Sequence, residues 1–177
     1  MRIISGKYRG LKIQAPSKLP VRPTTDMAKE ALFNFVEQRF EIEELEVLDL
    51  FAGTGNISFE FLSRGVKKIT SVDRSFDCVK FIQETNKKLN FIAELIKNDV
   101  FKFLKNEQQK YDLIFADPPY DLPNIPEVIH WVQTNNLLHE NGLLIIEHAS
   151  MQNLSSYKGF IESRKYGNST FSIFKKI

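Results

Sequence analysis

Two short stretches of this sequence combine residue types that could do chemistry. The first runs from Asp49 to Gly55 (Asp-Leu-Phe-Ala-Gly-Thr-Gly) and continues an apolar run. Its glycines let a ligand approach the backbone, and free N–H groups at a helix start favour an anionic group. The second stretch, Asp-Pro-Pro-Tyr at 117–120, places a carboxylate and rigidly held carbonyls beside an aromatic ring. Such acceptors suit a planar base that carries an exocyclic amine.

The patterns around the first stretch predict a strand, a turn, a helix and a second strand. Leu45 to Leu50 is mostly apolar, as in a buried strand of a parallel sheet. Asn56 to Arg64 places apolar residues on one helical face. Lys68 to Val72 predicts the next strand, which Asp73 ends. Because a carboxylate there can accept hydrogen bonds from both hydroxyls of a ribose, this region predicts a nucleoside-containing ligand.

The second stretch follows a further predicted strand, Tyr111 to Ala116. In open α/β sheets, ligands bind at the carboxyl ends of the strands, where the strand order reverses. We therefore expect residues 117–120 to lie beside the glycine turn, so that both stretches contribute to one site.

Strands alternate with helices along the chain, which predicts a doubly wound α/β fold with a mostly parallel, seven-stranded sheet. We expect one globular domain, with a basic N-terminal arm over residues 1–22 and the main domain over residues 23–177. Two hairpins are also predicted, an N-terminal one of two short strands over 2–13 and a closing one of strands 160–166 and 170–176 around Gly167-Asn168. Further helices are predicted over 26–40, 75–89 and 100–104, and another is marked by Ile125, Val128, Ile129 and Val132. Further strands are predicted over 94–97 and 142–147, and an acidic linker over 41–46.

The charge is distributed unevenly, although its total is only +2. Residues 1–22 carry a charge of +6 without a single acid, residues 158–177 carry +4, and −8 remains for the segment between. Basic ends on an acidic body predict a polyanionic partner, and nucleic acid is the best fit for the acid-free N-terminal run. The C-terminal group is better explained as a solvated surface. The candidate RNA-binding residues are Arg2, Lys7, Arg9, Lys12 and Arg22.

Several classes of protein are disfavoured. The sequence has no apolar run long enough to span a bilayer, and its start lacks the hydrophobic region of a signal peptide, so we expect a cytoplasmic protein without a membrane partner. Its single cysteine, Cys78, cannot form an intrachain disulfide and is predicted to be a buried thiol. No metal site is predicted, because His130, His139 and His148 are scattered, and His148 receives no role.

The two stretches, in this order, resemble the S-adenosylmethionine-dependent methyltransferases that modify exocyclic amines of bases. Two N-terminal stretches narrow the resemblance: Arg-Ile-Ile-Ser-Gly-x-Tyr-Arg-Gly from Arg2, and Arg-Pro-Thr-Thr-Asp-x-x-x-Glu-x-Leu-Phe-Asn from Arg22. Both are similar to the RsmD family of bacterial 16S rRNA (guanine-N2)-methyltransferases. The likeness runs from Arg2 to about His148.

The resemblance implies a class I methyltransferase fold, S-adenosylmethionine as the cofactor, and 16S rRNA in an assembling 30S subunit as the substrate of a monomeric enzyme. It also implies that residues 22–25 close over the site, that Asp73 holds the cofactor ribose, and that Asp99 holds the adenine amine. Tyr120 replaces a phenylalanine of some relatives, and either ring can stack. The residues that the resemblance assigns to the cofactor are Thr24, Thr25, Asp49, Phe51, Ala52, Gly53, Gly55, Asp73 and Asp99, and those that it assigns to catalysis on the target base are Asp117, Pro118 and Tyr120.

Three other functions use similar features. An adenine-N6 methyltransferase on DNA or RNA shares the Asp-Pro-Pro-Tyr motif, but this chain has little room for a separate base-reading domain. A nonenzymatic RNA-binding protein would not need the intact glycines and aspartates. An NAD oxidoreductase could use Asp73 and Arg74, but Ser58 stands where the third glycine of the dinucleotide fingerprint is expected.

Overall fold

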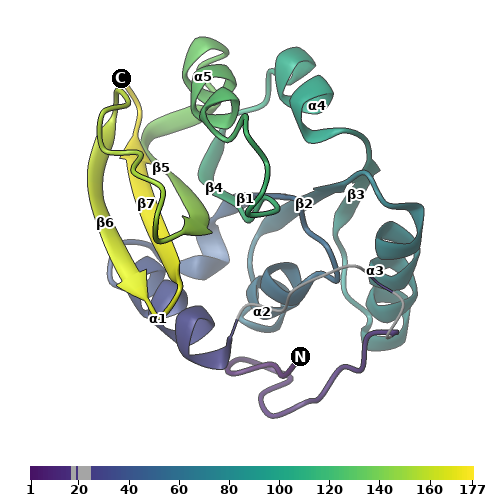
Figure 1. Cartoon of the computed structure of the whole chain (residues 1–177). Helices are drawn as coiled ribbons and strands as arrows, with labels where there is room; N and C mark the ends of the chain where they lie inside the picture. Colours follow the sequence, from purple (N-terminus) through teal and green to yellow (C-terminus); the bar gives the residue numbers. More distant parts are fainter. Residues whose placement is uncertain (17–18, 20–24) are drawn as a thin grey trace.

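A computed structural model describes residues 1–16, 19 and 25–177. Within these residues, seven strands form one sheet with the order β3-β2-β1-β4-β5-β7-β6 (Figure 1). The strands are β1 (Glu46–Leu50), β2 (Lys68–Asp73), β3 (Glu94–Lys97), β4 (Tyr111–Ala116), β5 (Leu138–Ala149), β6 (Phe160–Tyr166) and β7 (Ser169–Lys175), and the helices are α1 (Asp26–Glu37), the 3₁₀ turn η1 (Ile42–Glu44), α2 (Asn56–Ser63), α3 (Phe76–Leu89), α4 (Val100–Asn106) and α5 (Pro126–Thr134).

The sheet has the predicted doubly wound topology. β1 pairs in parallel with both β2 and β4, and β2 and β4 pair in parallel with β3 and β5. The chain therefore builds the sheet in one direction from β1 to β3 and in the other direction from β4 onward. β7 is antiparallel to β5 and β6, and it forms the predicted closing hairpin with β6. The order reverses between β1 and β4, where a ligand site is expected.

Helices cover both faces of the sheet because successive strand residues point to opposite sides. Leu48 and Ile114 pack into a buried cluster with residues of α4 and α5. Val47 and Leu113, one position earlier on the same strands, belong to a second cluster that includes residues of α1 and α2. On α3, Ile82 packs with Phe59 of α2. The largely apolar character of both strands explains why β1 and β4 could be recognised from sequence.

The predicted N-terminal hairpin forms, but its two halves are too short to be regular strands. In the described part of the chain, one antiparallel bridge between Arg2 and Lys12 and a few backbone hydrogen bonds between residues 1–3 and 10–13 join them. The reason lies in the amides between them. The backbone N–H groups of Ile4 and Ser5 donate to the Glu60 carboxylate, at 2.8 and 2.9 Å, instead of to a partner strand.

Element boundaries also differ from the prediction. α1 ends at Glu37 rather than at residue 40, since the amides of residues 39 and 40 both donate to the Val36 carbonyl in a closing turn. The predicted acidic linker contains the turn η1, which Ile42 anchors in the core. α4 continues to Asn106, and β5 spans Leu138–Ala149 because it pairs with both β4 and β7.

The arm is fastened along α2 rather than projecting from the domain. The backbone N–H of Lys7 donates to the Ser63 carbonyl at 2.7 Å, and that of Tyr8 donates to the Ser63 hydroxyl at 3.0 Å. The Ser63 hydroxyl donates in turn to the Ser5 carbonyl. Residues of the predicted arm therefore pack on the main domain, and the predicted boundary at residue 22 lies outside the described residues. Among the described residues, no helix has the length and apolar character needed to cross a bilayer.

Candidate active site

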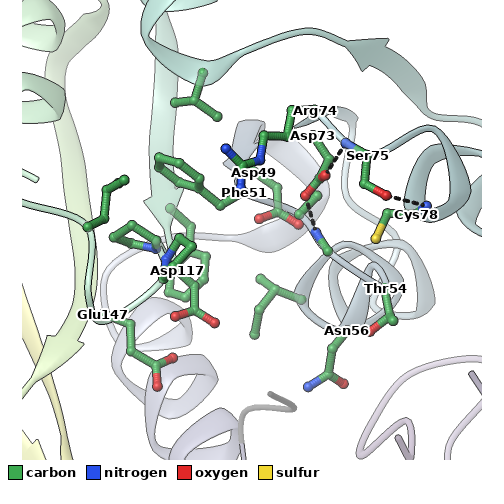
Figure 2. Close-up of a pocket in the computed structure, with 18 of the residues that line it drawn as sticks. Asp49, Phe51, Thr54, Asn56, Asp73, Arg74, Ser75, Cys78, Asp117 and Glu147 are labelled. Carbon is green, nitrogen blue, oxygen red and sulfur yellow. Dashed lines mark hydrogen bonds between the residues drawn. The ribbon is translucent and has the colours of Figure 1, made fainter. Parts of the chain in front are cut away.

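A cavity of about 430 Å³ opens at the carboxyl ends of the central strands. Both chemical stretches line it, as the switch-point argument predicts (Figure 2). Its walls also include residues from the ends of β2, β5 and β7 and from the starts of α2, α3 and α4. The predicted site residues that line it are Thr25, Asp49, Phe51, Ala52, Gly53, Asp73, Asp99, Asp117, Pro118 and Tyr120.

The turn after β1 takes its shape from left-handed backbone positions. Phe51, Gly53 and Gly55 have φ angles of 59°, 54° and 77°. Glycine adopts such angles without strain, whereas Phe51 adopts one at a cost, within an otherwise tightly bonded turn. Gly55 is buried and lies outside the cavity lining. A Cβ at this position would come within 3.1 Å of the Phe59 ring and 3.0 Å of Ile82. The structure therefore gives Gly55 a role in helix packing.

Asp73 joins the loops that follow β1 and β2. Its Oδ2 accepts a hydrogen bond from the Gly53 N–H, and its Oδ1 accepts one from the Ser75 N–H, both at 2.8 Å (Figure 2). Each oxygen has a second lone pair, so the carboxylate can still accept from ligand hydroxyls. The Asp73 carboxylate is thus held in place before any ligand binds.

Asp49 is a buried acid at the base of the cavity. The Ser58 hydroxyl donates to its Oδ2 and lies 2.7 Å from the Ser71 hydroxyl. Burial raises the pKa of Asp49 to about 7, with a smaller contribution from the negative charge of Asp73, while the Ser58 hydrogen bond opposes the shift. Near neutral pH, Asp49 is therefore divided between its acid and carboxylate forms.

Asp99 begins α4 on the other side of the cavity. Its Oδ1 accepts hydrogen bonds from the Phe101 and Lys102 amides, at 3.1 and 3.0 Å, and so caps the helix. The Phe101 ring packs edge-on against Phe51, with centroids 6.1 Å apart. This side of the cavity combines a fixed carboxylate with aromatic surface.

The stretch after β4 is held at both ends. The Asp117 N–H donates to the Leu50 carbonyl at 3.4 Å, and the Tyr120 hydroxyl bonds to Ser169 of β7 and donates to Glu147 Oε1 at 3.3 Å. Pro118 is buried between these anchors. The Tyr120 hydroxyl thus holds this stretch against β5 and β7, a role that stacking of the ring on a base does not need.

Among the polar residues of the cavity that were not identified from sequence, Glu147 and Ser169 lie closest in the chain fold to the Asp-Pro-Pro-Tyr stretch, since both bond to Tyr120. Glu147 ends the predicted strand 142–147 and lies near the carboxyl end of β5, beside β4. An acid at such a position could have been recognised from sequence as a candidate site residue. Ser169 comes from an antiparallel strand about 50 residues further along the chain than the Asp-Pro-Pro-Tyr stretch, and no local pattern indicates it.

A buried lysine below the cavity was also missed. Lys29 lies on the buried face of α1, where sequence reasoning placed only apolar residues. Its ammonium donates to the Arg2 carbonyl at 2.6 Å and to Asn56 Oδ1 at 2.9 Å, and it forms an ion pair with Glu60 at 3.3 Å. Burial lowers the pKa of Lys29, and the charge of Glu60 opposes that shift. Because Asn56 lines the cavity, this network connects the arm to the site.

His148 lies outside the cavity lining and is buried in the sheet. Its Nδ1 lies 3.0 Å from the Ala149 carbonyl, so it carries the proton and donates to that carbonyl, while Nε2 accepts from the Ser172 hydroxyl at 2.8 Å. Burial lowers the pKa of His148, which favours this neutral form. The geometry gives this histidine a structural role.

The described members of the predicted RNA-binding group, Arg2, Lys7, Arg9 and Lys12, lie outside the cavity lining. Arg2 pairs with Asp26 at 2.9 Å on the surface, and Lys7, Arg9 and Lys12 are exposed along the arm. Thr25 lines the cavity and also caps α1 by accepting from the Ala28 amide. Two predicted site residues, Arg22 and Thr24, lie outside the described residues.

Comparison with known proteins agrees with this site. A family model described as "Conserved hypothetical protein 95" matches residues 1–175. The chain is 32% identical to the putative rRNA methyltransferase YlbH of Bacillus subtilis, over 99% of both chains. It is 35% identical to ribosomal RNA small subunit methyltransferase D of Haemophilus influenzae, over 83% of this chain and 78% of that protein.

The fold has a close counterpart among solved structures. A putative methyltransferase from Escherichia coli, yhhF, superimposes with a TM-score of 0.85 at 25% identity, over 99% of this chain and 97% of that one. This match confirms the predicted class I methyltransferase fold. The chain therefore belongs to the family described as Conserved hypothetical protein 95, the RsmD family of methyltransferases that its motifs resemble.

Proposed function

We propose that this protein uses S-adenosylmethionine to methylate the exocyclic N2 amine of a guanine in 16S rRNA of the small ribosomal subunit. The observation that carries the proposal is the opening of the glycine turn and the Asp-Pro-Pro-Tyr stretch into the same cavity. The names of the relatives, which include a ribosomal RNA small subunit methyltransferase, support rRNA as the substrate.

The residues of the cavity fit the cofactor. Asp73 supplies fixed acceptors for ribose hydroxyls, Asp99 supplies one for the adenine amine, and Phe51 and Phe101 supply apolar surface for the ring. Asp49 offers negative charge to the cationic methionine end. When bound there, S-adenosylmethionine supplies an electrophilic methyl group on a positively charged sulfur.

The loop after β4 is suited to orient the target amine. The guanine N2 lone pair is delocalised into the ring, so the amine is a weak nucleophile. Hydrogen bonds from its two N–H groups to the Asp117 carboxylate and the Pro118 carbonyl favour a lone pair directed at the methyl group. A hydrogen bond to a charged acceptor contributes about 1.5–3 kcal/mol. Positioning of the reacting atoms supplies more, roughly 7–11 kcal/mol.

The methylated nitrogen carries an extra proton and is strongly acidic at that point. The Asp117 carboxylate accepts this proton or passes it to water, so no base with a tuned pKa is required. The target nucleotide must leave any stack to reach the cavity, and the Tyr120 ring then supports the displaced base. Proteins often recognise RNA by its shape, which favours a partly assembled subunit as the substrate.

The test uses small ribosomal subunits from cells that lack the gene, with labelled S-adenosylmethionine and identification of the modified nucleoside. We expect N2-methylguanosine from the natural protein. We expect Asp117→Ala to abolish turnover while cofactor affinity stays within about threefold, because Asp117 is proposed to contact the target guanine and not the cofactor. N6-methyladenosine as the product contradicts the substrate assignment, and full activity of Asp117→Ala contradicts the role of Asp117.

Naked 16S rRNA and assembly intermediates serve as parallel substrates in the same assay. Faster methylation of the intermediates supports recognition of the assembling subunit. Equal rates on naked rRNA contradict recognition of the assembling subunit, but they do not test the proposed chemistry of the site.

A further inference from the structure

A second carboxylate stands beside Asp117 at the carboxyl edge of the sheet. β4 and β5 pair in parallel, with Ala116 opposite Ile146. The next residues, Asp117 and Glu147, therefore follow on neighbouring strands, which are separated by about 4.8 Å. Both side chains line the cavity, and Figure 2 shows their carboxylates in the same part of it. Glu147 is 3% exposed, so this position is sheltered from water outside the cavity.

The Glu147 carboxylate is also tied to the ring that is expected to support the base. The Tyr120 hydroxyl donates to Glu147 Oε1 at 3.3 Å and bonds to Ser169. The Tyr120 ring and the Glu147 carboxylate are thus connected before the substrate arrives, and Asp117 follows the neighbouring strand.

The chemistry of this arrangement distinguishes purines. A carboxylate and a backbone carbonyl can only accept hydrogen bonds. Guanine has two adjacent kinds of donor on its Watson–Crick edge, the N1–H and the N2 amine. Adenine has a donor at N6 but an acceptor at N1, and that lone pair would face a carboxylate. A buried polar group without its partner is costly, and more so when it is charged.

We propose that Glu147 accepts the N1–H of the target guanine and so determines the specificity of the site for guanine over purines with an acceptor at N1. This inference rests on the proposed function, in which Asp117 and Pro118 accept the hydrogens of the N2 amine. Glu147 is then a specificity-determining residue that contacts the substrate directly.

The test compares two target bases that both carry an amine at C2. Small subunits are reconstituted with 16S rRNA that has either guanine or 2-aminopurine at the methylated position. 2-Aminopurine keeps the amine but has an acceptor at N1. We expect kcat/KM of the natural protein to be lower on 2-aminopurine by between about 10-fold and 100-fold, the equivalent of one hydrogen bond to a charged group. Equal kcat/KM on the two bases overturns the proposal without any variant.

Glu147→Gln then assigns the discrimination to this residue. A glutamine amide can donate to the N1 of 2-aminopurine, which a carboxylate cannot do. We expect the variant to lose activity on guanine, to gain relative activity on 2-aminopurine, and to narrow the ratio of kcat/KM by about tenfold or more. An unchanged ratio in a variant that still binds S-adenosylmethionine overturns the role of Glu147.

Tyr120→Phe is the matched control. It removes the hydroxyl that contacts Glu147 but leaves the carboxylate in place. We expect it to lower turnover on both bases by a similar factor and to leave their ratio unchanged. If Tyr120→Phe narrows the ratio as Glu147→Gln does, Glu147 acts only through the tyrosine and the proposal fails. A natural protein that methylates no guanine at all contradicts the proposed function instead, so the two failures are distinguishable.

Discussion

At the scale of single residues, Asp49 shows how the fold changes the chemistry of a side chain. The sequence places an acid near the end of an apolar strand, and the structure buries it beside the hydroxyls of Ser58 and Ser71. Burial is the main reason that the pKa of Asp49 rises to about 7, and the nearby Asp73 adds to it. A cation bound in the cavity favours the charged carboxylate, and it therefore lowers this pKa.

We accordingly expect S-adenosylmethionine binding to release protons near neutral pH. With a pKa of about 7 in the free protein, Asp49 is about half protonated at pH 7. Binding should then release about half a proton more from the natural protein than from Asp49→Asn, and affinity should rise between about pH 6 and 8. Calorimetry in buffers of different ionisation enthalpy measures the number of protons released on binding.

The Asp49→Asn variant is the control, since its amide does not titrate in this range. Its far-UV circular dichroism spectrum checks that it is folded. Equal proton release by the two proteins contradicts the assignment of the raised pKa to Asp49.

At the scale of elements, the contact between the arm and α2 decides where the basic residues lie. Gly6 has a φ angle of +80°, and a Cβ at this position would lie 2.0 Å from the Ser63 carbonyl oxygen. The arm can follow α2 this closely only because Gly6 has no side chain. Glu60 of α2 holds the preceding amides of the arm and also pairs with Lys29. The arm, α1 and the helix that begins at the cavity therefore form one connected unit.

We expect Gly6→Ala to release the arm from α2. The methyl group would overlap backbone atoms that cannot move aside as a flexible side chain can. RNA binding should weaken by about tenfold or more, and protease cleavage within residues 1–13 should become faster, because the arm loses hydrogen bonds to Ser63 and Glu60. Filter binding and limited proteolysis measure these effects.

Gly10→Ala is the matched control for this substitution. Gly10 has a similar φ angle of +85°, but a Cβ there would meet nothing within 4 Å. It should therefore carry only the backbone strain of about 1–2 kcal/mol for a left-handed residue. Equal effects of the two substitutions on RNA binding and proteolysis would show that strain alone is responsible.

At the scale of the whole molecule, the two basic ends lie on different parts of the surface. Figure 1 shows the N-terminal arm running past α2, while β6 and β7 form one edge of the sheet. Lys7, Arg9 and Lys12 are exposed on the arm. The arm bonds to Ser63 of α2, and the first residues of α2 line the cavity. This arrangement favours the arm as a surface that contacts the rRNA backbone.

We expect the replacement of Lys7, Arg9 and Lys12 by glutamine to weaken RNA binding and to reduce its salt dependence. Removing one phosphate contact lowers the slope of log K against log salt concentration by about 0.7–0.9, so the three substitutions together lower it by about two to three. Affinity for S-adenosylmethionine should remain within about twofold, since none of these residues lines the cavity. Filter binding at several salt concentrations measures the slope.

A second triple variant, with Lys158, Lys165 and Lys175 replaced by glutamine, removes the same charge from the C-terminal group. These side chains are also exposed. The salt slope should change little in this variant. A larger reduction of the slope here than in the arm variant would place the RNA on the β6–β7 edge instead.

The sequence by itself determined the succession of strands and helices along the chain and the position of both chemical stretches. Apolar runs such as Val47–Leu50 and Leu113–Ala116 report burial on both faces, and glycines or prolines report where such strands end. These signals are local, and the switch-point rule then brings the two stretches together without any knowledge of side-chain packing. The cavity lining confirms that they meet.

The tertiary structure alone decided which distant groups complete the site. Glu147 and Ser169 reach the Tyr120 hydroxyl from strands β5 and β7, and Lys29 is buried because Glu60 and Asn56 of another helix solvate its charge. The amides of Ile4, Ser5 and Lys7 bond to α2, so the hairpin of the arm stays short. All these contacts join residues separated by 27 or more positions. Periodicity within one segment cannot report such contacts, because their energies depend on how the elements pack against one another.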